Sequence, residues 1–195
     1  MRVILASKSP RRKEILENLG LKFDIVVANA DESCDETEPH ARVAALAAIK
    51  GRAVLDMIDD KDDVLLIASD TLVYACGEFL GKPKNKEDAE RMMRLLSGRA
   101  HSVLSGLYLY CCGREYCSAA ETKVIFDEMT DSEIESYIST DEPYDKAGGY
   151  AVQGLASLYV SGLEGDYFNV VGLPVNLLYK ALKNEFGIDI ESLKA

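Results

Sequence analysis

The sequence has no surplus of basic residues and no long hydrophobic run. Its 195 residues include 33 Asp and Glu against 22 Lys and Arg, which gives a formal net charge of −11 at pH 7. A chain with this charge has no general field that attracts DNA, RNA or an anionic membrane. No apolar run approaches the roughly 18 residues needed to cross a bilayer, and no signal peptide is recognisable. We therefore expect a cytoplasmic protein that binds neither nucleic acid nor membranes.

Cysteine pairs at metal-ligand spacing are also missing. The five cysteines form no CxxC pair, and neither of the two histidines lies at ligand spacing. This pattern predicts reduced thiols, with no zinc site and no structural disulfide. No internal repeat or low-complexity linker is present, and 48% hydrophobic residues suffice for a substantial core. We expect one domain over residues 1–195.

Strand and helix patterns alternate in the first half of the chain, and hairpin patterns follow in the middle. The sequence therefore predicts a mixed α/β fold. Strands are expected at residues 3–6, 23–27, 64–68, 101–110 and 116–126, with hairpins around Cys76-Gly77 and Gly113. Helices are expected at residues 10–19, 38–57 and 85–97, after a capping box at 130–133, and between Pro174 and Gly187.

A strongly basic helix start follows the first apolar run. Ser9 is a suitable N-cap whose hydroxyl would accept a backbone N–H, and Pro10 suits the first helical position. The first turn carries Arg11, Arg12 and Lys13, although the positive end of a helix dipole disfavours cations. These groups become favourable together when a phosphate or carboxylate docks among them. The alternative is a solvated basic turn whose arginine stems cover apolar surface.

Acidic and basic side chains also follow predicted strands. Asp70 comes at the end of the apolar strand 64–68, and Glu32 lies just beyond the strand 23–27. If these strands are neighbours, both carboxylates could bind one divalent cation together with substrate phosphates. Lys82 would add a point charge for a phosphate, and the glycines around Asp145-Lys146 let the backbone approach a ligand. Each residue alone could be a turn former or a solvated side chain, but the combination indicates phosphate chemistry.

Residues 5–16, LASKSPRRKEIL, are similar to the opening signature of the Maf family. Further family motifs occur in the same order at residues 68–71, 81–83, 96–98, 101–103, 142–148, 153–154 and 169–174. The resemblance implies a mixed, elongated β-sheet flanked by helices in two lobes with a central cleft, related to inosine triphosphatases. It also implies hydrolysis of a nucleoside triphosphate between the α and β phosphates, with Mg²⁺ or Mn²⁺ as cofactor. A homodimer is a further expectation from the family.

The resemblance also implies roles for individual residues. It places the catalytic carboxylate on Asp70, and the pattern of Arg12, Thr71 and Gln153 resembles the branch that acts on dTTP and UTP rather than 7-methyl-GTP. The substrate-binding candidates are Ser7, Ser9, Arg11, Arg12, Lys50, Thr71, Lys82, Asp145, Lys146 and Gln153, and the metal candidates are Glu32 and Asp70.

The base of the nucleotide offers a partner for Gln153. Uracil and thymine present an N3–H donor beside carbonyl acceptors, and a Gln amide matches that edge if Tyr150 or a loop carbonyl holds it rigid. Two other functions stay open: a nucleotide-binding regulator of cell division with little turnover, and a protein-interaction scaffold. A regulator would not need Glu32 and Asp70, which repel a triphosphate unless a metal lies between them.

Overall fold

The computed structural model describes residues 1–194, and its mixed α/β architecture confirms the predicted fold class. The strands are β1 (Arg2–Leu5), β2 (Asp24–Ile25), β3 (Val64–Ala75), β4 (Glu78–Leu80), β5 (Ala100–Cys111), β6 (Arg114–Phe126) and β7 (Val160–Glu164). The α-helices are α1 (Pro10–Asn18), α2 (Pro39–Leu55), α3 (Lys86–Leu96), α4 (Asp131–Ile138), α5 (Tyr167–Val171) and α6 (Val175–Ala181). The strand order is β2-β1-β3-β5-β6-β7, and β4 pairs with β3. β1 is parallel to both β2 and β3, whereas β3–β4 and β6–β7 are antiparallel.

The chain divides into two compact units, each made of separate segments. The first unit comprises Met1–Asp70, Ser105–Ala120 and the segment from Gly172 onward. The second unit comprises Thr71–Leu104 and Glu121–Val171. Three strands, β3, β5 and β6, contribute residues to both units.

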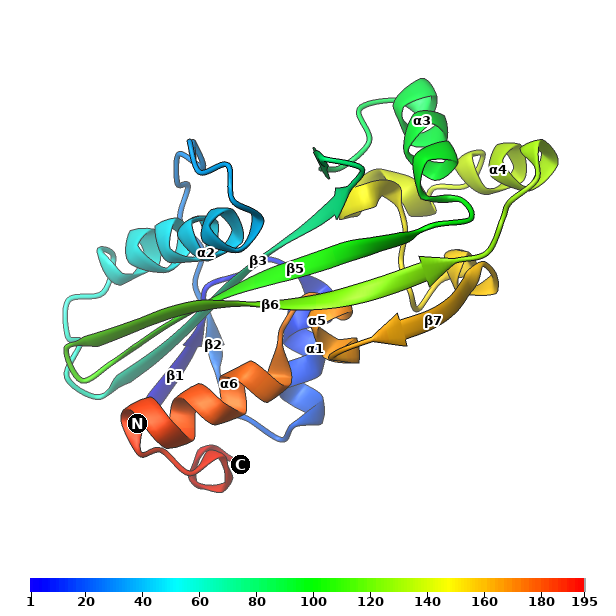
Figure 1. Cartoon of the computed structure of the whole chain (residues 1–195). Helices are drawn as coiled ribbons and strands as arrows, with labels where there is room; N and C mark the ends of the chain where they lie inside the picture. The colour runs from blue at the N-terminus through cyan, green and yellow to red at the C-terminus, as the bar shows by residue number, and fades with distance from the viewer. Residues whose placement is uncertain (195) are drawn as a thin grey trace. The chain divides into compact units, whose positions relative to one another are not determined.

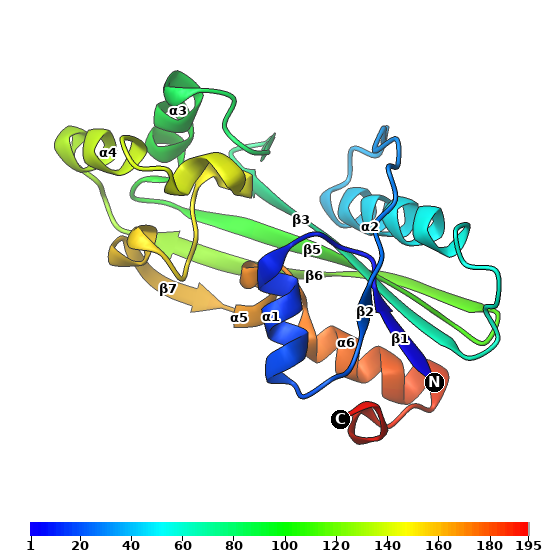
Figure 2. The ribbon, with the colours of Figure 1, turned by 180° about the vertical axis from the view of Figure 1, so that it is seen from behind.

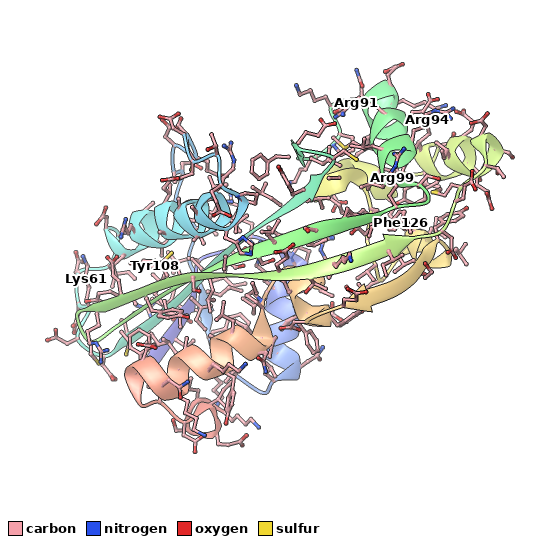
Figure 3. All side chains as sticks on the ribbon, viewed as in Figure 1. Lys61, Arg91, Arg94, Arg99, Tyr108 and Phe126 are labelled. Carbon is pink, nitrogen blue, oxygen red and sulfur yellow. The ribbon has the colours of Figure 1, made fainter. Side chains whose placement is uncertain are left out.

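In the first unit, helices cover both faces of the strands. Figures 1 and 2 show α2 on one face and α1 and α6 on the other. Two glycines allow α2 to approach β5 closely. A Cβ on Gly106 would lie 2.0 Å from the carbonyl oxygen of Val43, and a Cβ on Gly51 would lie 2.1 Å from the Tyr108 ring (Figure 3). The contact between α2 and β5 therefore depends on the absence of side chains at these positions.

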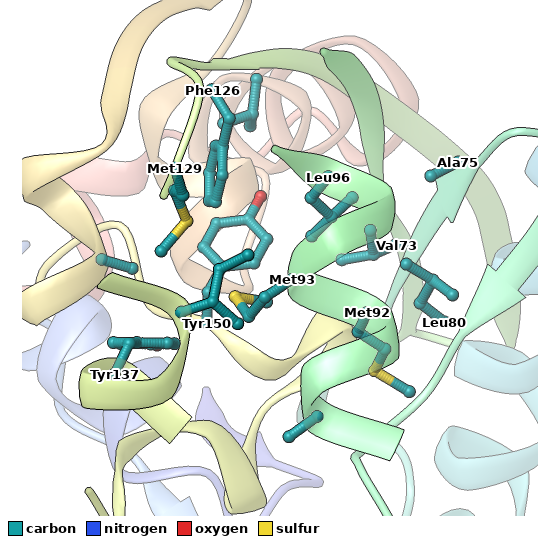
Figure 4. Close-up of a cluster of buried hydrophobic side chains, with 14 of the residues drawn as sticks. Val73, Ala75, Leu80, Met92, Met93, Leu96, Phe126, Met129, Tyr137 and Tyr150 are labelled. Carbon is teal, nitrogen blue, oxygen red and sulfur yellow. The ribbon is translucent and has the colours of Figure 1, made fainter. Parts of the chain in front are cut away.

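The core of the second unit is a cluster of apolar and aromatic side chains (Figure 4). Tyr150 lies at its centre, with its ring centroid 4.9 Å from that of Phe126. Met93 of α3 and Tyr137 of α4 are buried in the same cluster, which joins these two helices to the sheet. His101 is also buried, and its Nε2 lies 2.6 Å from the Tyr150 hydroxyl.

Two local predictions, the hairpin turns and the capping box of α4, are confirmed. The turns at Cys76-Gly77 and Cys112-Gly113 have positive φ at both residues, as in type I′ hairpin turns. Thr130 and Glu133 form the expected capping box of α4. Among the described residues all five cysteines are free thiols, and no helix is long and apolar enough to span a membrane.

The prediction that Asp70 ends a strand is wrong. β3 runs without interruption from Val64 to Ala75, so Asp70 lies within it, where the strand passes from the first unit to the second. The polar residues Ser69, Asp70 and Thr71 suggest a turn, but within the strand Ser69 donates to the Gly172 carbonyl and Asp70 pairs with Lys50. The short elements β7 and α5 were not predicted, because neither has a long enough apolar pattern.

Candidate active site

Helix α1 begins at Pro10 in the predicted basic turn, but its N-terminus is capped differently from the prediction. Ser9 occupies the N-cap position with φ −65° and ψ 118°, and its side chain makes no capping hydrogen bond. Instead, the backbone N–H of Ser9 donates to Oγ of Ser7 at 3.2 Å. The local hydroxyl partner is therefore Ser7, two residues earlier in the chain.

Arg12 is held by contacts that anchor its guanidinium group. Its Nε donates to the carbonyl oxygen of Gly172 at 2.7 Å, and Nη1 donates to Ser7 Oγ at 3.0 Å. Burial lowers the pKa of Arg12, whereas the negative charge of Asp70 acts in the opposite direction, with a smaller contribution from Glu32. Arg12 is thus a fixed cation close to acidic side chains, which disfavours the alternative of a freely solvated basic turn.

The two predicted metal-binding carboxylates share one cationic partner. Asp70 of β3 is only 9% exposed, and its carboxylate contacts Nζ of Lys50 from α2. The same Nζ lies 3.1 Å from Oε2 of Glu32, in the loop between β2 and α2. In the described part of the chain, His, Cys, Asp and Glu form no group of three or more that could hold a metal ion.

This donor set is compatible with a hard divalent cation. Glu32 and Asp70 already reach one positive charge, the ammonium group of Lys50. Magnesium is commonly bound by one or two carboxylates, with water and substrate phosphates completing its coordination. The residues present therefore fit an ion whose remaining ligands come from the substrate.

Two loops of the second unit bring further predicted residues together. The N–H of Gly148 donates to the carbonyl oxygen of Gly81 at 3.0 Å, so the loop that contains Lys82 lies against the segment that follows Lys146. Lys82 is exposed, whereas Lys146 Nζ donates to the carbonyl oxygen of Glu142 at 2.8 Å and pairs with the carboxylate of Asp145. The charge of Lys146 is therefore partly compensated by Asp145.

Tyr150 or a loop carbonyl was expected to hold Gln153 rigid, and the hydroxyl of Tyr150 is buried 2.6 Å from Nε2 of His101. The loop that carries the exposed Gln153 contacts the side chain of Glu142. The Glu142 carboxylate accepts hydrogen bonds from the backbone N–H of Leu155 at 2.8 Å and of Ala156 at 3.3 Å.

For the remaining candidate residues, the structure gives the burial and the unit to which each belongs. Arg11 and Thr71 are both half-buried, the first in α1 and the second next to Asp70 on β3. Ser7, Ser9, Arg11, Arg12, Glu32, Lys50 and Asp70 belong to the first unit, and Thr71, Lys82, Asp145, Lys146 and Gln153 belong to the second.

Sequence reasoning missed Ser69, Gly172 and Glu142 as residues that support these groups. Ser69 Oγ donates to the Gly172 carbonyl at 3.1 Å, the same oxygen that accepts from Arg12. A hydroxyl in an otherwise apolar strand was a signal for Ser69. No local pattern points to the carboxylate of Glu142, because its partners lie 13 and 14 residues further along the chain.

Comparisons with known proteins extend over nearly the whole chain. The family model described as "Maf-like protein" matches residues 2–185. A protein of Caldanaerobacter subterraneus subsp. tengcongensis named dTTP/UTP pyrophosphatase is 46% identical over 190 residues, covering 96% of this chain and 91% of the relative. A protein of Alkaliphilus metalliredigens with the same name is 45% identical over 192 residues, covering 97% and 98%.

A solved structure shows the same fold at much lower sequence identity. The Ham1 protein of Staphylococcus aureus matches with a TM-score of 0.53 and 11% identity, covering 95% of this chain and all of the Ham1 chain. This likeness concerns the fold alone, whereas the family model and the relatives above 40% identity concern the sequence itself. On this evidence, the chain belongs to the Maf-like protein family.

Proposed function

We propose that this chain is a pyrophosphatase that hydrolyses dTTP and UTP between the α and β phosphates, releasing the nucleoside monophosphate and pyrophosphate. Relatives named dTTP/UTP pyrophosphatase are 45–46% identical to it over nearly full length. The structural observation that carries the proposal is the Lys50 ammonium group shared by Glu32 and Asp70, together with the anchored Arg12. Phosphoryl transfer depends mainly on positioned charges of these kinds.

We propose that Glu32 and Asp70 hold a divalent cation, Mg²⁺ or Mn²⁺. When bound, such an ion neutralises charge on the triphosphate and polarises a phosphoryl oxygen. The support is the donor set: two carboxylates that reach one common cationic partner, of which Asp70 is nearly buried. The ammonium group of Lys50 prevents repulsion between these carboxylates when no metal is bound.

The residues of the first unit also have roles in substrate binding and water activation. We propose that the carboxylate of Asp70 orients the attacking water and accepts its proton. Arg12 binds the phosphate chain, and its hydrogen bond to Gly172 fixes the guanidinium group before the substrate arrives. We assign further phosphate contacts to Ser7, Ser9, Arg11 and Lys50.

The residues of the second unit supply further phosphate contacts and the contact to the base. Lys82 is exposed and binds a phosphate as a point charge, with Thr71, Asp145 and Lys146 as additional polar contacts. We propose that Gln153 pairs with the N3–H and a carbonyl of uracil or thymine. Cytosine reverses part of this hydrogen-bond pattern, so UTP and dTTP are preferred over CTP.

The test is a panel of UTP, dTTP, CTP, ATP and GTP, with and without Mg²⁺, in which pyrophosphate is measured separately from orthophosphate. UMP or dTMP with pyrophosphate as the primary products supports the proposal. UDP with orthophosphate contradicts it, and tight nucleotide binding without turnover would favour the regulator of cell division.

Assembly as a homodimer in the cytoplasm completes the proposal. Its support is the family resemblance, and light scattering of the purified protein tests the dimer directly.

A further inference from the structure

The loop around Gln153 is held by a single carboxylate from a distant position in the sequence. Glu142 lies in the 3-10 helix Glu142–Asp145, and its side chain accepts hydrogen bonds from two consecutive backbone N–H groups, those of Leu155 and Ala156. These groups open the 3-10 turn Leu155–Leu158, only two residues after Gln153. A carboxylate bound to backbone N–H groups makes charge-assisted hydrogen bonds, which are about twice as strong as neutral ones.

Gly154, the residue next to Gln153, leaves the space that the Glu142 carboxylate occupies. A Cβ on Gly154 would lie 2.4 Å from both carboxylate oxygens of Glu142. No L side chain fits there unless the carboxylate moves away. The absence of a side chain at position 154 therefore lets Glu142 close directly over the loop.

Glu142 is itself fixed by the core of the second unit. The hydroxyl of Tyr137 donates to Oε1 of Glu142 at 3.1 Å. Tyr137 is buried in the cluster shown in Figure 4, and its hydroxyl also lies 3.2 Å from the carbonyl oxygen of Gly149. Burial, together with the Glu142 charge, raises the pKa of Tyr137, so this hydroxyl stays protonated at neutral pH. Contacts thus run from the packed core through Tyr137 and Glu142 to the backbone beside Gln153.

We propose that Glu142 is a positioning residue for base selection: it holds the backbone at residues 154–156 so that the amide of Gln153 keeps one orientation toward the base. The inference rests on the proposed function, in which Gln153 reads uracil and thymine. A Gln side chain on a mobile loop could flip its amide and accept cytosine as well, so discrimination requires a rigid support. Glu142 supplies such a support, and the Tyr150 hydroxyl is paired with His101.

The Glu142→Gln variant is the sharpest test because it keeps the size of the side chain. The two oxygens of Glu142 together accept three hydrogen bonds, from the Tyr137 hydroxyl and from the N–H groups of Leu155 and Ala156. A Gln side chain has an NH₂ group in place of one oxygen, so it cannot accept all three in the same way. Glu133→Gln is the matched control. Glu133 also accepts a backbone N–H, that of Thr130 at 2.7 Å, and this hydrogen bond belongs to the capping box of α4, on a different helix from residues 153–156.

The readouts are kcat and KM for UTP and CTP and the exchange rates of the Leu155 and Ala156 amide protons. In Glu142→Gln we expect the ratio of kcat/KM for UTP over CTP to fall by about tenfold or more, with a larger change in KM than in kcat. Exchange at the two amides should accelerate by about tenfold or more. Glu133→Gln should leave the ratio and both amides unchanged.

A double-variant cycle separates positioning from general damage to the unit. If Glu142 acts through Gln153, adding Glu142→Gln to Gln153→Ala should not lower the UTP-to-CTP ratio further. An additional loss of the same size in that background would overturn the proposal, as would an unchanged ratio in Glu142→Gln alone.

The failure of the proposed function would look different. If the wild-type protein does not distinguish UTP from CTP or does not hydrolyse either, base selection by Gln153 is refuted, and the inference falls with it before any variant is made. If the wild-type protein discriminates and Glu142→Gln discriminates equally well, only the inference fails.

Discussion

At the residue scale, Lys50 determines how the acidic pair behaves in the absence of a ligand. Its ammonium group contacts Asp70 and lies 3.1 Å from Glu32, so neither carboxylate faces the other without compensation. In the proposed function, Glu32 and Asp70 would hold a divalent ion, which would supply positive charge to the same two carboxylates.

We expect Asp70→Asn to lower kcat for UTP at least ~100-fold, the scale of a lost acid–base group. The substitution keeps the shape of the side chain but removes the negative charge that a metal and an attacking water require. The fold should survive, since Lys50 keeps Glu32 as a partner. Steady-state kinetics and thermal melting, with Asp24→Asn on the exposed β2 as control, test this. Near-normal turnover in a normally folded variant would rule out both roles of Asp70.

Arg12→Ala should reduce kcat/KM for UTP by about 1.5–3 kcal/mol, which corresponds to ~10- to 150-fold. From the sequence alone, removing a cation from the positive end of a helix should not reduce stability. The structure changes this expectation, because Gly172 and Ser7 lose the donor that Arg12 provides. We therefore expect the free energy of unfolding to fall by about 1 kcal/mol. Lys13→Ala, in the same helical turn, is the control for the loss of charge.

His101 should make the stability of the protein sensitive to mild acid. Burial lowers the pKa of this side chain from 6.5 to about 4, so the unfolded state takes up its proton first as the pH falls. No stability is lost through protonation of His101 above pH 6.5, and up to about 3 kcal/mol is lost between pH 6.5 and 4. Denaturant unfolding of the wild type and of His101→Gln across this range measures the difference. Parallel pH profiles for the two proteins would contradict the assignment.

At the scale of elements, helices, strands and turns with strong periodicity or characteristic turn residues could be predicted from the sequence. Contacts between distant segments could not. The I′ turns and the capping box have local signatures, and the structure contains them. The full length of β3 could not be predicted, because Ser69 and Asp70 are residue types common in turns. Their partners, Gly172 and Lys50, are distant in the sequence and are known only from the structure. The same reason applies to the candidate site. Residue types identified Arg12 and Asp70 as candidates, whereas the support that Glu142 gives the Gln153 loop depends on the folded backbone.

The packing of α2 on β5 predicts a large effect of a small substitution. In Gly106→Ala, the new Cβ would lie 2.0 Å from the Val43 carbonyl oxygen, which belongs to backbone that cannot rotate away. We expect the free energy of unfolding to fall by at least ~2 kcal/mol, within the range of core overpacking. Gly81→Ala is the control, because a Cβ there meets nothing within 4 Å. Chemical denaturation of both variants tests the prediction, and equal stabilities would contradict it.

At the scale of the whole molecule, the net charge of −11 opposes the binding of a free triphosphate. A divalent cation held by Glu32 and Asp70, as proposed above, would lower the negative charge of both the nucleotide and this pair. Treatment with EDTA should therefore reduce turnover of UTP at least ~100-fold, and added Mg²⁺ or Mn²⁺ should restore it. Calcium chelation by EGTA in the presence of excess Mg²⁺ is the control. Full activity in EDTA would contradict a metal held by these carboxylates.

The way in which the chain is divided between the two units constrains how the protein can be made. The first unit needs residues 1–70, the hairpin tip at 105–120 and the final segment from Gly172. The Gly172 carbonyl accepts hydrogen bonds from Arg12 and Ser69. During synthesis, Gly172 is added only after the whole second unit has been translated. Arg12, in the first turn of α1, therefore cannot form its hydrogen bond to Gly172 until all the residues between them have been synthesised. No uninterrupted gene fragment encodes the first unit alone, and premature termination before Gly172 leaves Arg12 without its main-chain acceptor.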